Sequence, residues 1–372
     1  MRSDNRDHPA LRIPHSAFDM NSPILILGGA GFVGTNLALS FLERGQSVIA
    51  FDNLSRAGVE DNLDVLRRQR AFGRPFEWVE GDVRDADLLA HCVNRAGAMV
   101  HLAAQVAVTT SLVAPLEDFE INARGTLNAL EAVRLRPGGP VPFLFTSTNK
   151  VYGALDDLTV RLEGDRYAPT DTNVARWGLS EARPLDFHSP YGCSKGAADA
   201  YVLDYARSYD LPASVFRMSC IYGPHQKGNE DQGWVAHFLL RALRGQSITL
   251  YGDGKQVRDV LWVGDLVRAF HLALDHPAQA SGRAWNLGGG PRNAVSLLEV
   301  VDAIAHHTGT RPDAEFGDWR VGDQRYYVSD TRGFERAFGW RAQVDAREGI
   351  ARLYEWMRDH TNVASGAEAV TA

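Results

Sequence analysis

Short apolar runs alternate with stretches of helical length from Pro23 to residue 218, and this alternation limits the possible folds more than any other feature. The apolar runs are typical of buried strands and lie at 23–28, 47–52, 76–80, 98–102, 141–147 and 213–218. The stretches of helical length lie at 32–44, 60–70, 85–95, 116–135 and 190–209. This order is typical of a parallel sheet covered by helices on both faces. We therefore predict an α/β fold with a doubly wound parallel sheet.

The chain divides into parts that differ in pattern. Residues 22–220 are predicted to form the sheet domain, and the charged segment 154–189 within it is longer than an ordinary loop. We expect residues 1–21 to form a loose N-terminal arm and 361–372 a frayed tail. The rest, 221–360, is predicted to form a smaller mixed α/β lobe, interleaved with the sheet domain, with helices near 231–244, 264–276, 296–307 and 345–358.

Charge and composition exclude several classes of protein. The 372 residues carry a formal net charge of −7 and no basic stripe, so nucleic acid is not an expected partner. No apolar run approaches the ~20 residues that a membrane-spanning helix needs, so we expect no membrane partner. The three cysteines, Cys92, Cys193 and Cys220, lack the spacing of a metal site, and no metal is expected. Their small, odd number favours reduced thiols in a cytoplasmic protein.

The segment GGAGFVG at 28–34 lies between the first predicted strand and the first predicted helix. Glycines at 28, 31 and 34 allow a tight turn and let a pyrophosphate approach the helix N-terminus, where free N–H groups favour anions. A glycine turn that binds nothing is the alternative, but the position between strand and helix is the one that a dinucleotide-binding loop requires. We predict a Rossmann-type domain over 22–220 whose cofactor contacts the loop residues Gly28, Gly31, Phe32, Val33 and Gly34.

Polar and small residues follow the next strands, at the edge where such a sheet binds its ligand. Asp52 ends the second strand, where its carboxylate can accept hydrogen bonds from the adenosine ribose and would repel a 2′-phosphate. NAD is therefore favoured over NADP, although Arg56 follows nearby. We expect His101 to be packed in the core. The other residues predicted to contact the cofactor at these strand ends are Asn53, Asp82, Val83, Leu102, Ala103 and Ala104.

The segment SPYGCSK at 189–195 begins a predicted helix and places Tyr191 four residues before Lys195, so both side chains share one helix face. A free tyrosine has a pKa of about 10 and is a poor base at neutral pH. The neighbouring ammonium and a positive nicotinamide ring would both stabilise the phenolate and lower that pKa. Such a tyrosine could take a proton from a hydroxyl while hydride leaves the same carbon. The spacing is common by chance, and its position behind a dinucleotide loop is what favours a catalytic role.

Together these motifs resemble the extended short-chain dehydrogenase/reductase family, which contains the epimerases and dehydratases of nucleotide sugars. The resemblance covers about 23–360 and includes NARGT at 122–126, VYG at 151–153, YGP at 222–224 and RDV at 258–260. It implies an NAD-dependent enzyme that acts on a nucleotide sugar. It also implies that Thr148 contacts the reacting hydroxyl and Tyr191, and that Lys195 binds the nicotinamide ribose. Asn122 would lie at the cofactor-binding part of the site and support the active-site helix.

The stretch TSTNKVYG at 146–153 narrows the reaction. Dehydratases of the family carry an Asp–Glu pair directly after the hydroxyl residue, and its decarboxylases that make UDP-xylose keep a glutamate there. In this chain Asn149 and Lys150 occupy those positions. Reversible hydride transfer needs no such carboxylate. The resemblance therefore implies an epimerase, an isomerase that works through a keto intermediate with Tyr191 as base and then as acid.

A closer resemblance favours the group of 2-epimerases that act on CDP-sugars such as CDP-paratose. It rests on LDFHSPYGCSKGAAD at 185–199, EDQGW at 230–234 and GKQVRDV at 254–260. A 4-epimerase of UDP- or dTDP-sugars is the alternative. Many family members carry an asparagine three residues after the arginine that is Arg217 here, whereas this chain has Cys220. A non-catalytic NAD-binding regulatory protein is the third hypothesis.

The resemblance also implies contacts to the substrate in the smaller lobe, toward which 154–189 would extend. Arg258 and Arg320 would bind the diphosphate, since guanidinium suits bidentate phosphate binding, and Arg325 is a third candidate. Family members commonly pair through helices that correspond to 116–135 and 190–209, so we expect a homodimer or homotetramer. The other residues expected at the substrate are Asn149, Lys227, Asp231 and Trp234.

Overall fold

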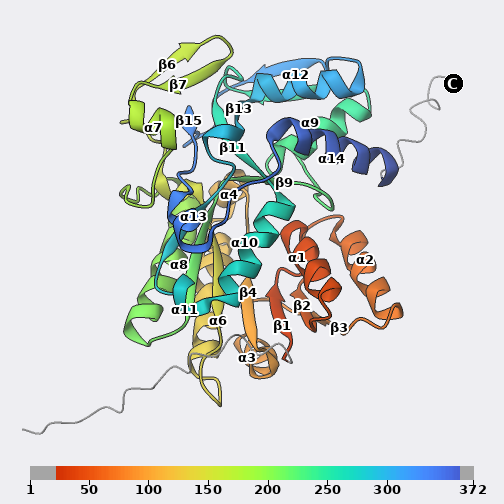
Figure 1. The fold of residues 1–372 in the computed structure, drawn as a ribbon, viewed down its shortest axis with the longest axis vertical. Helices are drawn as coiled ribbons and strands as arrows, with labels where there is room; N and C mark the ends of the chain where they lie inside the picture. Colours follow the sequence, from red (N-terminus) through yellow and green to blue (C-terminus); the bar gives the residue numbers. More distant parts are fainter. Residues whose placement is uncertain (1–21, 361–372) are drawn as a thin grey trace, which may run out of the picture.

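The computed structural model describes residues 22–360, so the predicted arm and tail lie outside the described residues. Its centre is a seven-stranded parallel sheet (Figure 1). From β1 the chain builds outward to β3 and then returns to β4 on the other side of β1, which confirms the predicted doubly wound α/β fold. In spatial order the strands are β12 (Ala284–Leu287), β8 (Ala213–Met218), β5 (Phe143–Thr148), β4 (Ala98–His101), β1 (Ile24–Leu27), β2 (Val48–Asp52) and β3 (Phe76–Glu80).

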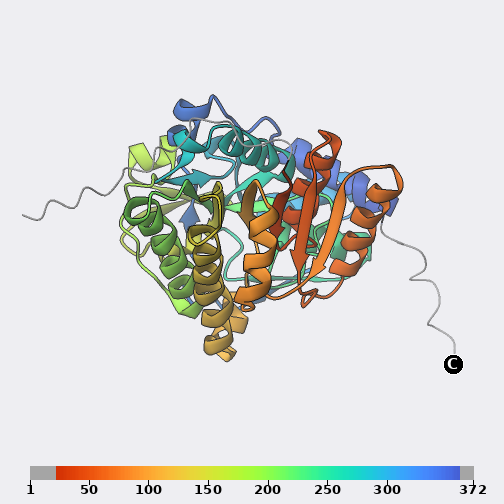
Figure 2. The ribbon, with the colours of Figure 1, turned by 90° about the horizontal axis from the view of Figure 1, so that it is seen from below.

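The central strands are mainly apolar because helices cover both faces of the sheet. All four residues of β1 are buried, as a doubly covered parallel sheet requires. No helix within 22–360 is long and apolar enough to cross a membrane. One face of the sheet packs against α1 (Phe32–Glu43), α2 (Val59–Ala71) and α10 (Val263–Asp275), and the other against α3 (Ala86–Arg95), α6 (Gly125–Arg134) and α8 (Ser189–Ser208) (Figure 2).

Two parts of the sheet domain differ from the sequence prediction. Strand β12 comes from residues assigned to the smaller lobe, and it extends the sheet by pairing in parallel with β8. Its four residues, AWNL, are too few to distinguish a strand from a turn of helix. The predicted helix at 116–135 is divided into α5 (Pro115–Phe119), the π-helix η1 (Glu120–Arg124) and α6, and a further helix, α4 (Val108–Val113), precedes it. The division of the chain near residue 220 stays a prediction.

The smaller lobe follows directly from the carboxyl end of β8. It has its own apolar core, in which α9, α12 and α14 pack against the strands. A capping box formed by Ser296 and Glu299 begins α12. Its elements are β9 (Cys220–Tyr222), α9 (Trp234–Leu243), β10 (Ile248–Tyr251), β11 (Val257–Trp262), η3 (Pro291–Asn293), β13 (Ala294–Ser296), α12 (Leu297–Thr308), β14 (Ala314–Gly317), β15 (Tyr326–Tyr327) and α14 (Ala346–His360).

The segment 154–189 has secondary structure of its own. After η2 (Asn149–Tyr152) it forms a hairpin of β6 (Val160–Glu163) and β7 (Arg166–Pro169), followed by α7 (Thr172–Trp177). The hairpin lies against the smaller lobe (Figure 1), where the backbone N–H of Tyr167 donates to the carbonyl of Lys255 at 3.0 Å. The segment therefore joins the sheet domain to the smaller lobe.

Candidate active site

The loop between β1 and α1 brings backbone against backbone. Gly28 has a φ of +78°, and a Cβ there would lie 2.8 Å from the backbone nitrogen of Ala103, which follows β4. A Cβ on Gly34 would lie 2.2 Å from the carbonyl oxygen of Gly28. Helix α1 begins after Gly31 without a side-chain cap on its first N–H groups. A tight glycine cradle with free N–H donors fits a pyrophosphate group.

Asp52 ends β2 beside this loop and fixes its shape. Its carboxylate accepts hydrogen bonds from the backbone N–H groups of Ala30 at 3.1 Å and Leu54 at 2.9 Å. Burial raises the pKa of Asp52, and these hydrogen bonds oppose the shift. Arg56 is directed toward the smaller lobe, where its guanidinium donates to the carbonyl of Lys227 at 3.2 Å. The end of β2 thus offers a carboxylate suited to ribose hydroxyls.

The ends of β2 and β3 are joined by side chains. The Asn53 amide donates to the Asp82 carboxylate at 2.9 Å. Hydrogen bonds from Arg84 lower the pKa of Asp82 to about 2, so this carboxylate is charged at neutral pH. The remaining residues predicted at the cofactor are partly buried along the same edge, namely Phe32, Val33, Leu102, Ala103 and Ala104.

Two residues at these strand ends belong to the core. Val83 is buried, and a Cβ on Gly125 would lie 2.5 Å from one of its methyl groups. His101 is also buried, with Nε2 at 3.1 Å from the Thr126 hydroxyl, and burial lowers its pKa to about 3. His101 is thus the packed core residue that we expected.

Thr148, Tyr191 and Lys195 lie together where β5 meets α8. Thr148 is the last residue of β5, and its hydroxyl hydrogen-bonds with the Tyr191 phenol. Lys195 lies one helical turn beyond Tyr191, and its Nζ donates to the carbonyl oxygen of Thr146 at 2.7 Å. The same ammonium lies 4.2 Å from the centre of the Phe145 ring. The predicted hydroxyl, phenol and ammonium therefore lie side by side.

Burial dominates the ionisation of this group. Burial raises the pKa of Tyr191 to about 12, although the hydrogen bond from Thr148 opposes the shift. Burial lowers the pKa of Lys195 to about 7, opposed by the charges of Asp199 and Asp118. We expected Lys195 and the positive nicotinamide ring together to lower the pKa of Tyr191. In the protein alone the shift has the opposite sign, because desolvation of the phenolate outweighs its neighbours.

Asn122 lies in the π-helix η1, behind α8. Its amide nitrogen donates to the Ser194 hydroxyl at 3.1 Å and to the carbonyl of Gln105 at 3.0 Å. Ser194 in turn hydrogen-bonds to the carboxylate of Asp118. These contacts connect α8 to the segment after β4. π-Helical segments are frequent at functional sites.

The two residues after Thr148 have separate surroundings. Asn149 is buried, and its side-chain oxygen lies 3.3 Å from the Thr148 hydroxyl. The backbone N–H of Lys150 donates to that hydroxyl at 3.2 Å. The Lys150 ammonium lies at the smaller lobe, 3.3 Å from both the carbonyl of Gly322 and a carboxylate oxygen of Asp323. An amide therefore contacts Thr148 in this chain. In the dehydratases of the family that the motifs resemble, a carboxylate would stand at this position.

The predicted diphosphate arginines are spread over the smaller lobe. Arg258 is buried on β11 and donates to Asp323 at 2.6 Å, so it shares that carboxylate with Lys150. Arg325 lies over the ring of Tyr167 at 5.5 Å, against the inserted hairpin. Lys150 and Arg258 are therefore neighbours, while Arg325 belongs to a different contact.

Arg320 and Asp231 form an ion pair with an N–O distance of 3.2 Å. The Arg320 guanidinium also lies 3.8 Å from the centre of the Tyr251 ring. A partly exposed guanidinium in this setting can still exchange its partner for a phosphate. Of the predicted substrate residues, these two lie in direct contact.

Lys227 and Trp234 are engaged elsewhere. The Lys227 ammonium pairs with Asp61 on α2 at 2.6 Å, so it lies between the smaller lobe and the sheet domain. Trp234 begins α9, and its indole N–H donates to the sulfur of Cys220 at 3.4 Å. Its ring packs edge-on against Phe238 at 5.6 Å. Trp234 is therefore a packing residue of the lobe on at least one face.

Sequence reasoning missed Asp323 and the buried pair of Arg217 with Asp199. Asp323 lies in RVGDQR, between Arg320 and Arg325, so a carboxylate among expected phosphate-binding arginines was the available signal. Arg217 is the penultimate residue of β8 and donates two hydrogen bonds of 2.9 Å to Asp199 on α8. No pattern in the sequence indicates that pair, because the two residues meet only when α8 packs on the sheet.

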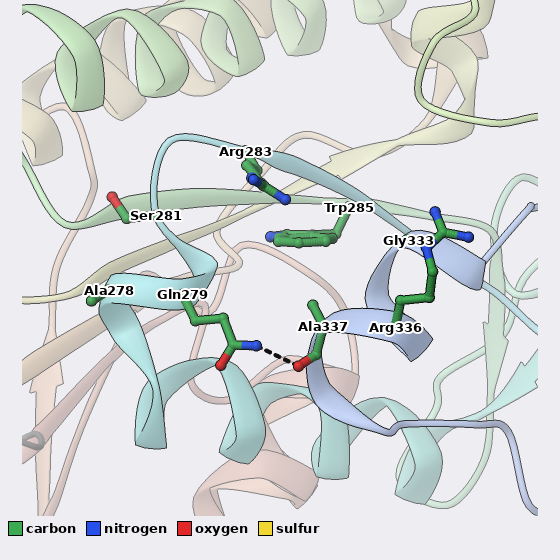
Figure 3. Close-up of a pocket in the computed structure, with 8 residues that line it drawn as sticks. All are labelled: Ala278, Gln279, Ser281, Arg283, Trp285, Gly333, Arg336 and Ala337. Atoms are coloured by element: carbon green, nitrogen blue, oxygen red, sulfur yellow. Dashed lines mark hydrogen bonds between the residues drawn. The ribbon is translucent and has the colours of Figure 1, made fainter.

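A separate cleft of about 590 Å³ lies beside β12, between α11 (Pro277–Ala280) and α13 (Arg332–Phe338) (Figure 3). The Gln279 amide donates to the carbonyl of Ala337 across its floor. Arg283 lies over the ring of Trp285 at 5.6 Å. None of the predicted site residues lines this cleft, so it is distinct from the site where β5 meets α8.

Residues 24–288 match the model of the NAD dependent epimerase/dehydratase family. The chain belongs to this family. It is accordingly an NAD-dependent enzyme with the extended short-chain dehydrogenase/reductase fold, as the motifs predicted. The glycine cradle, the uncapped α1 and the carboxylate of Asp52 fit its cofactor.

This chain is similar over most of its length to known epimerases of two kinds. The CDP-paratose 2-epimerase of Salmonella typhi is 42% identical over 342 residues, which cover 90% of this chain and 98% of that protein. The UDP-glucose 4-epimerase of Thermotoga maritima, solved with UDP-glucose, superposes with a TM-score of 0.77 at 29% identity, covering 91% of this chain and 99% of that one. The UDP-glucose 4-epimerase of Thermus thermophilus, solved with NAD, gives a TM-score of 0.75 at 32% identity with the same coverage.

Proposed function

We propose that this enzyme inverts carbon 2 of CDP-paratose or a closely related CDP-hexose. The observation that carries the proposal is the surroundings of Thr148, where Asn149 and Lys150 stand in place of the acids that dehydratases use. The identity of 42% to a CDP-paratose 2-epimerase, against 29% and 32% to the two UDP-glucose 4-epimerases, supports the choice of nucleotide and carbon.

In this proposal Tyr191 transfers the proton of the reacting hydroxyl. When bound, NAD supplies the hydride acceptor and, for the return step, the hydride donor at one sugar carbon. Tyr191 takes the hydroxyl proton while the carbonyl forms and returns it after the keto sugar has turned over in the pocket. Thr148 orients the hydroxyl. Because the pKa of Tyr191 in the protein alone is about 12, deprotonation depends on the nearby charge of Lys195 and on the positive charge that arrives with the cofactor.

The same proposal assigns the cofactor contacts. The N–H groups at the start of α1 would bind the pyrophosphate, and Asp52 the adenosine ribose. Lys195 would donate to the nicotinamide ribose from its position on α8. Asn122 would keep α8 in place through Ser194. Arg258 and Arg320 would bind the diphosphate of the substrate from the smaller lobe.

An NMR time course in deuterated water, without added cofactor, tests the reaction. CDP-paratose, CDP-glucose, UDP-glucose and dTDP-glucose are offered in parallel to the purified enzyme. We expect inversion at carbon 2 of a CDP-sugar without deuterium in the product, because the hydride returns to the carbon it left. Inversion at carbon 4 of a UDP- or dTDP-sugar would instead identify a 4-epimerase. Deuterium at the inverted carbon would contradict internal hydride transfer.

We also propose that the enzyme is a homodimer, in which α4, α5 and α8 of two copies meet. Leu112, Val113, Leu116 and Phe119 are 50%, 86%, 80% and 51% exposed, and they lie beside α8 with Tyr201 at 45%. So many exposed apolar side chains on adjacent helices are typical of an interface. Light scattering measures the oligomeric state directly.

We also propose a cytoplasmic location, since all three cysteines are free thiols.

A further inference from the structure

Lys150, Asp323 and Arg258 form a charged cluster between the sheet domain and the smaller lobe. One oxygen of the Asp323 carboxylate accepts hydrogen bonds from the Lys150 ammonium at 3.3 Å and from the Arg258 guanidinium at 2.6 Å. The same oxygen accepts the backbone N–H of Gln324 at 3.1 Å. Lys150 also donates to the carbonyl of Gly322. Two cations thus share one carboxylate oxygen.

The charges of this cluster do not balance. The side chains of Lys150, Arg258 and Asp323 are 24%, 7% and 18% exposed, so the excess positive charge lies in a poorly solvated place. Burial lowers the pKa of Lys150 and the charge of Arg258 adds to this shift, while Asp323 opposes it. The thiol of Cys220 is another neighbour of Lys150, and it adds no charge because burial raises its pKa. An excess buried charge is unfavourable unless an anion completes the cluster.

The cluster lies at a defined place relative to the reacting group. The backbone N–H of Lys150 donates to the hydroxyl of Thr148, the residue proposed to orient the reacting sugar hydroxyl. Arg258 comes from β11 of the smaller lobe. A substrate whose sugar contacts Thr148 would therefore lie beside Lys150, which follows Thr148 by two residues, whereas Arg258 belongs to the smaller lobe.

We infer that Lys150 and Arg258 together bind the diphosphate of the substrate, with Lys150 at the phosphate next to the sugar and Asp323 positioning both cations. The inference rests on the proposed function, in which the substrate is a nucleoside diphosphate sugar. It gives Lys150 a binding role in the segment where related dehydratases carry an acid. The guanidinium and ammonium suit a dianionic group that bridges two positions.

Binding of CDP and CMP to the full-length enzyme, measured by isothermal titration calorimetry, tests the inference. Lys150→Met should weaken CDP binding by about tenfold or more, because a charge-assisted hydrogen bond is lost. It should change CMP binding by less than about twofold, since CMP lacks the second phosphate. The matched control is Lys255→Met. Lys255 also donates to a backbone carbonyl, that of Gly164, and should leave both affinities unchanged.

A second variant separates phosphate binding from a purely structural role. Lys150→Gln can still donate to Gly322 and Asp323 but carries no charge. We expect it to lose CDP affinity as Lys150→Met does, with the bound NAD retained. Unchanged CDP affinity in Lys150→Gln, or equal losses for CDP and CMP in either variant, would overturn the inference.

The choice of base does not affect this test. The same measurements are made with UDP and UMP and with dTDP and dTMP. Tighter binding of another base would refute the CDP proposal. A loss of affinity in the Lys150 variants that is specific to the diphosphate would still support the role of Lys150. A wild-type enzyme that binds none of the three diphosphates would overturn both the proposed function and the inference.

Discussion

The ionisable groups where β5 meets α8 differ from the arginines of the smaller lobe in their surroundings. Tyr191 and Lys195 are buried, and desolvation shifts the pKa of each toward its neutral form. In the smaller lobe Arg320 pairs with Asp231 and Arg258 with Asp323, so each guanidinium has a carboxylate partner. The first arrangement suits groups that exchange a proton, and the second suits groups that bind a fixed anion.

We expect the largest effect from a substitution that removes the proton-transferring phenol hydroxyl. Tyr191→Phe should lower kcat by about a thousandfold, since general acid–base groups typically contribute 10²–10⁴. NAD retention and substrate affinity should change little because the ring remains. Stopped-time assays of the NMR reaction measure kcat. Tyr209→Phe, an exposed tyrosine directly after the same helix, is the control. Near-normal turnover in Tyr191→Phe would remove this residue from the mechanism.

The second prediction compares the loss of stability when one ion pair is broken in each region. Asp199→Asn leaves Arg217 uncompensated in a site where the two side chains are 0% and 5% exposed, and should lower the free energy of unfolding by about 3–5 kcal/mol. Asp231→Asn breaks the pair with Arg320 in a more exposed place and should cost about 1 kcal/mol or less. Urea unfolding of both variants measures the difference. Equal losses would show that burial does not distinguish these pairs.

The smallest effect is a pH dependence of stability that comes from Lys195. Burial holds its pKa at about 7 in the folded protein, against 10.5 for an exposed lysine, so the unfolded chain binds more protons between these pH values. The free energy of unfolding should therefore rise with pH over this range. From pH 6.5 to 9, the Tm of cofactor-free wild type should gain ~2 °C or more relative to Lys195→Met. A parallel pH dependence of the two proteins would show that Lys195 titrates normally.

Much of the sheet domain could be predicted because its signals are local. Strands buried on both faces are continuous apolar runs, and the glycines between β1 and α1 are required by backbone contacts within a few residues and with Ala103. Tyr191 and Lys195 share a helix face by their spacing alone. The sequence of the chain was therefore sufficient for the fold class and the family.

The tertiary structure alone decided what depends on distant contacts. Strand β12 is recognised as part of the sheet only by its pairing with β8. The pKa shifts of Tyr191 and Lys195 in the protein alone come from burial, which spacing cannot reveal, whereas the predicted lowering of the Tyr191 pKa also depends on the positive nicotinamide ring. Lys150 meets Asp323 across 173 positions of sequence, so its place beside Arg258 follows from how the smaller lobe packs against β5. Local patterns determine which groups a chain carries, whereas packing determines which of them meet and what charge they hold.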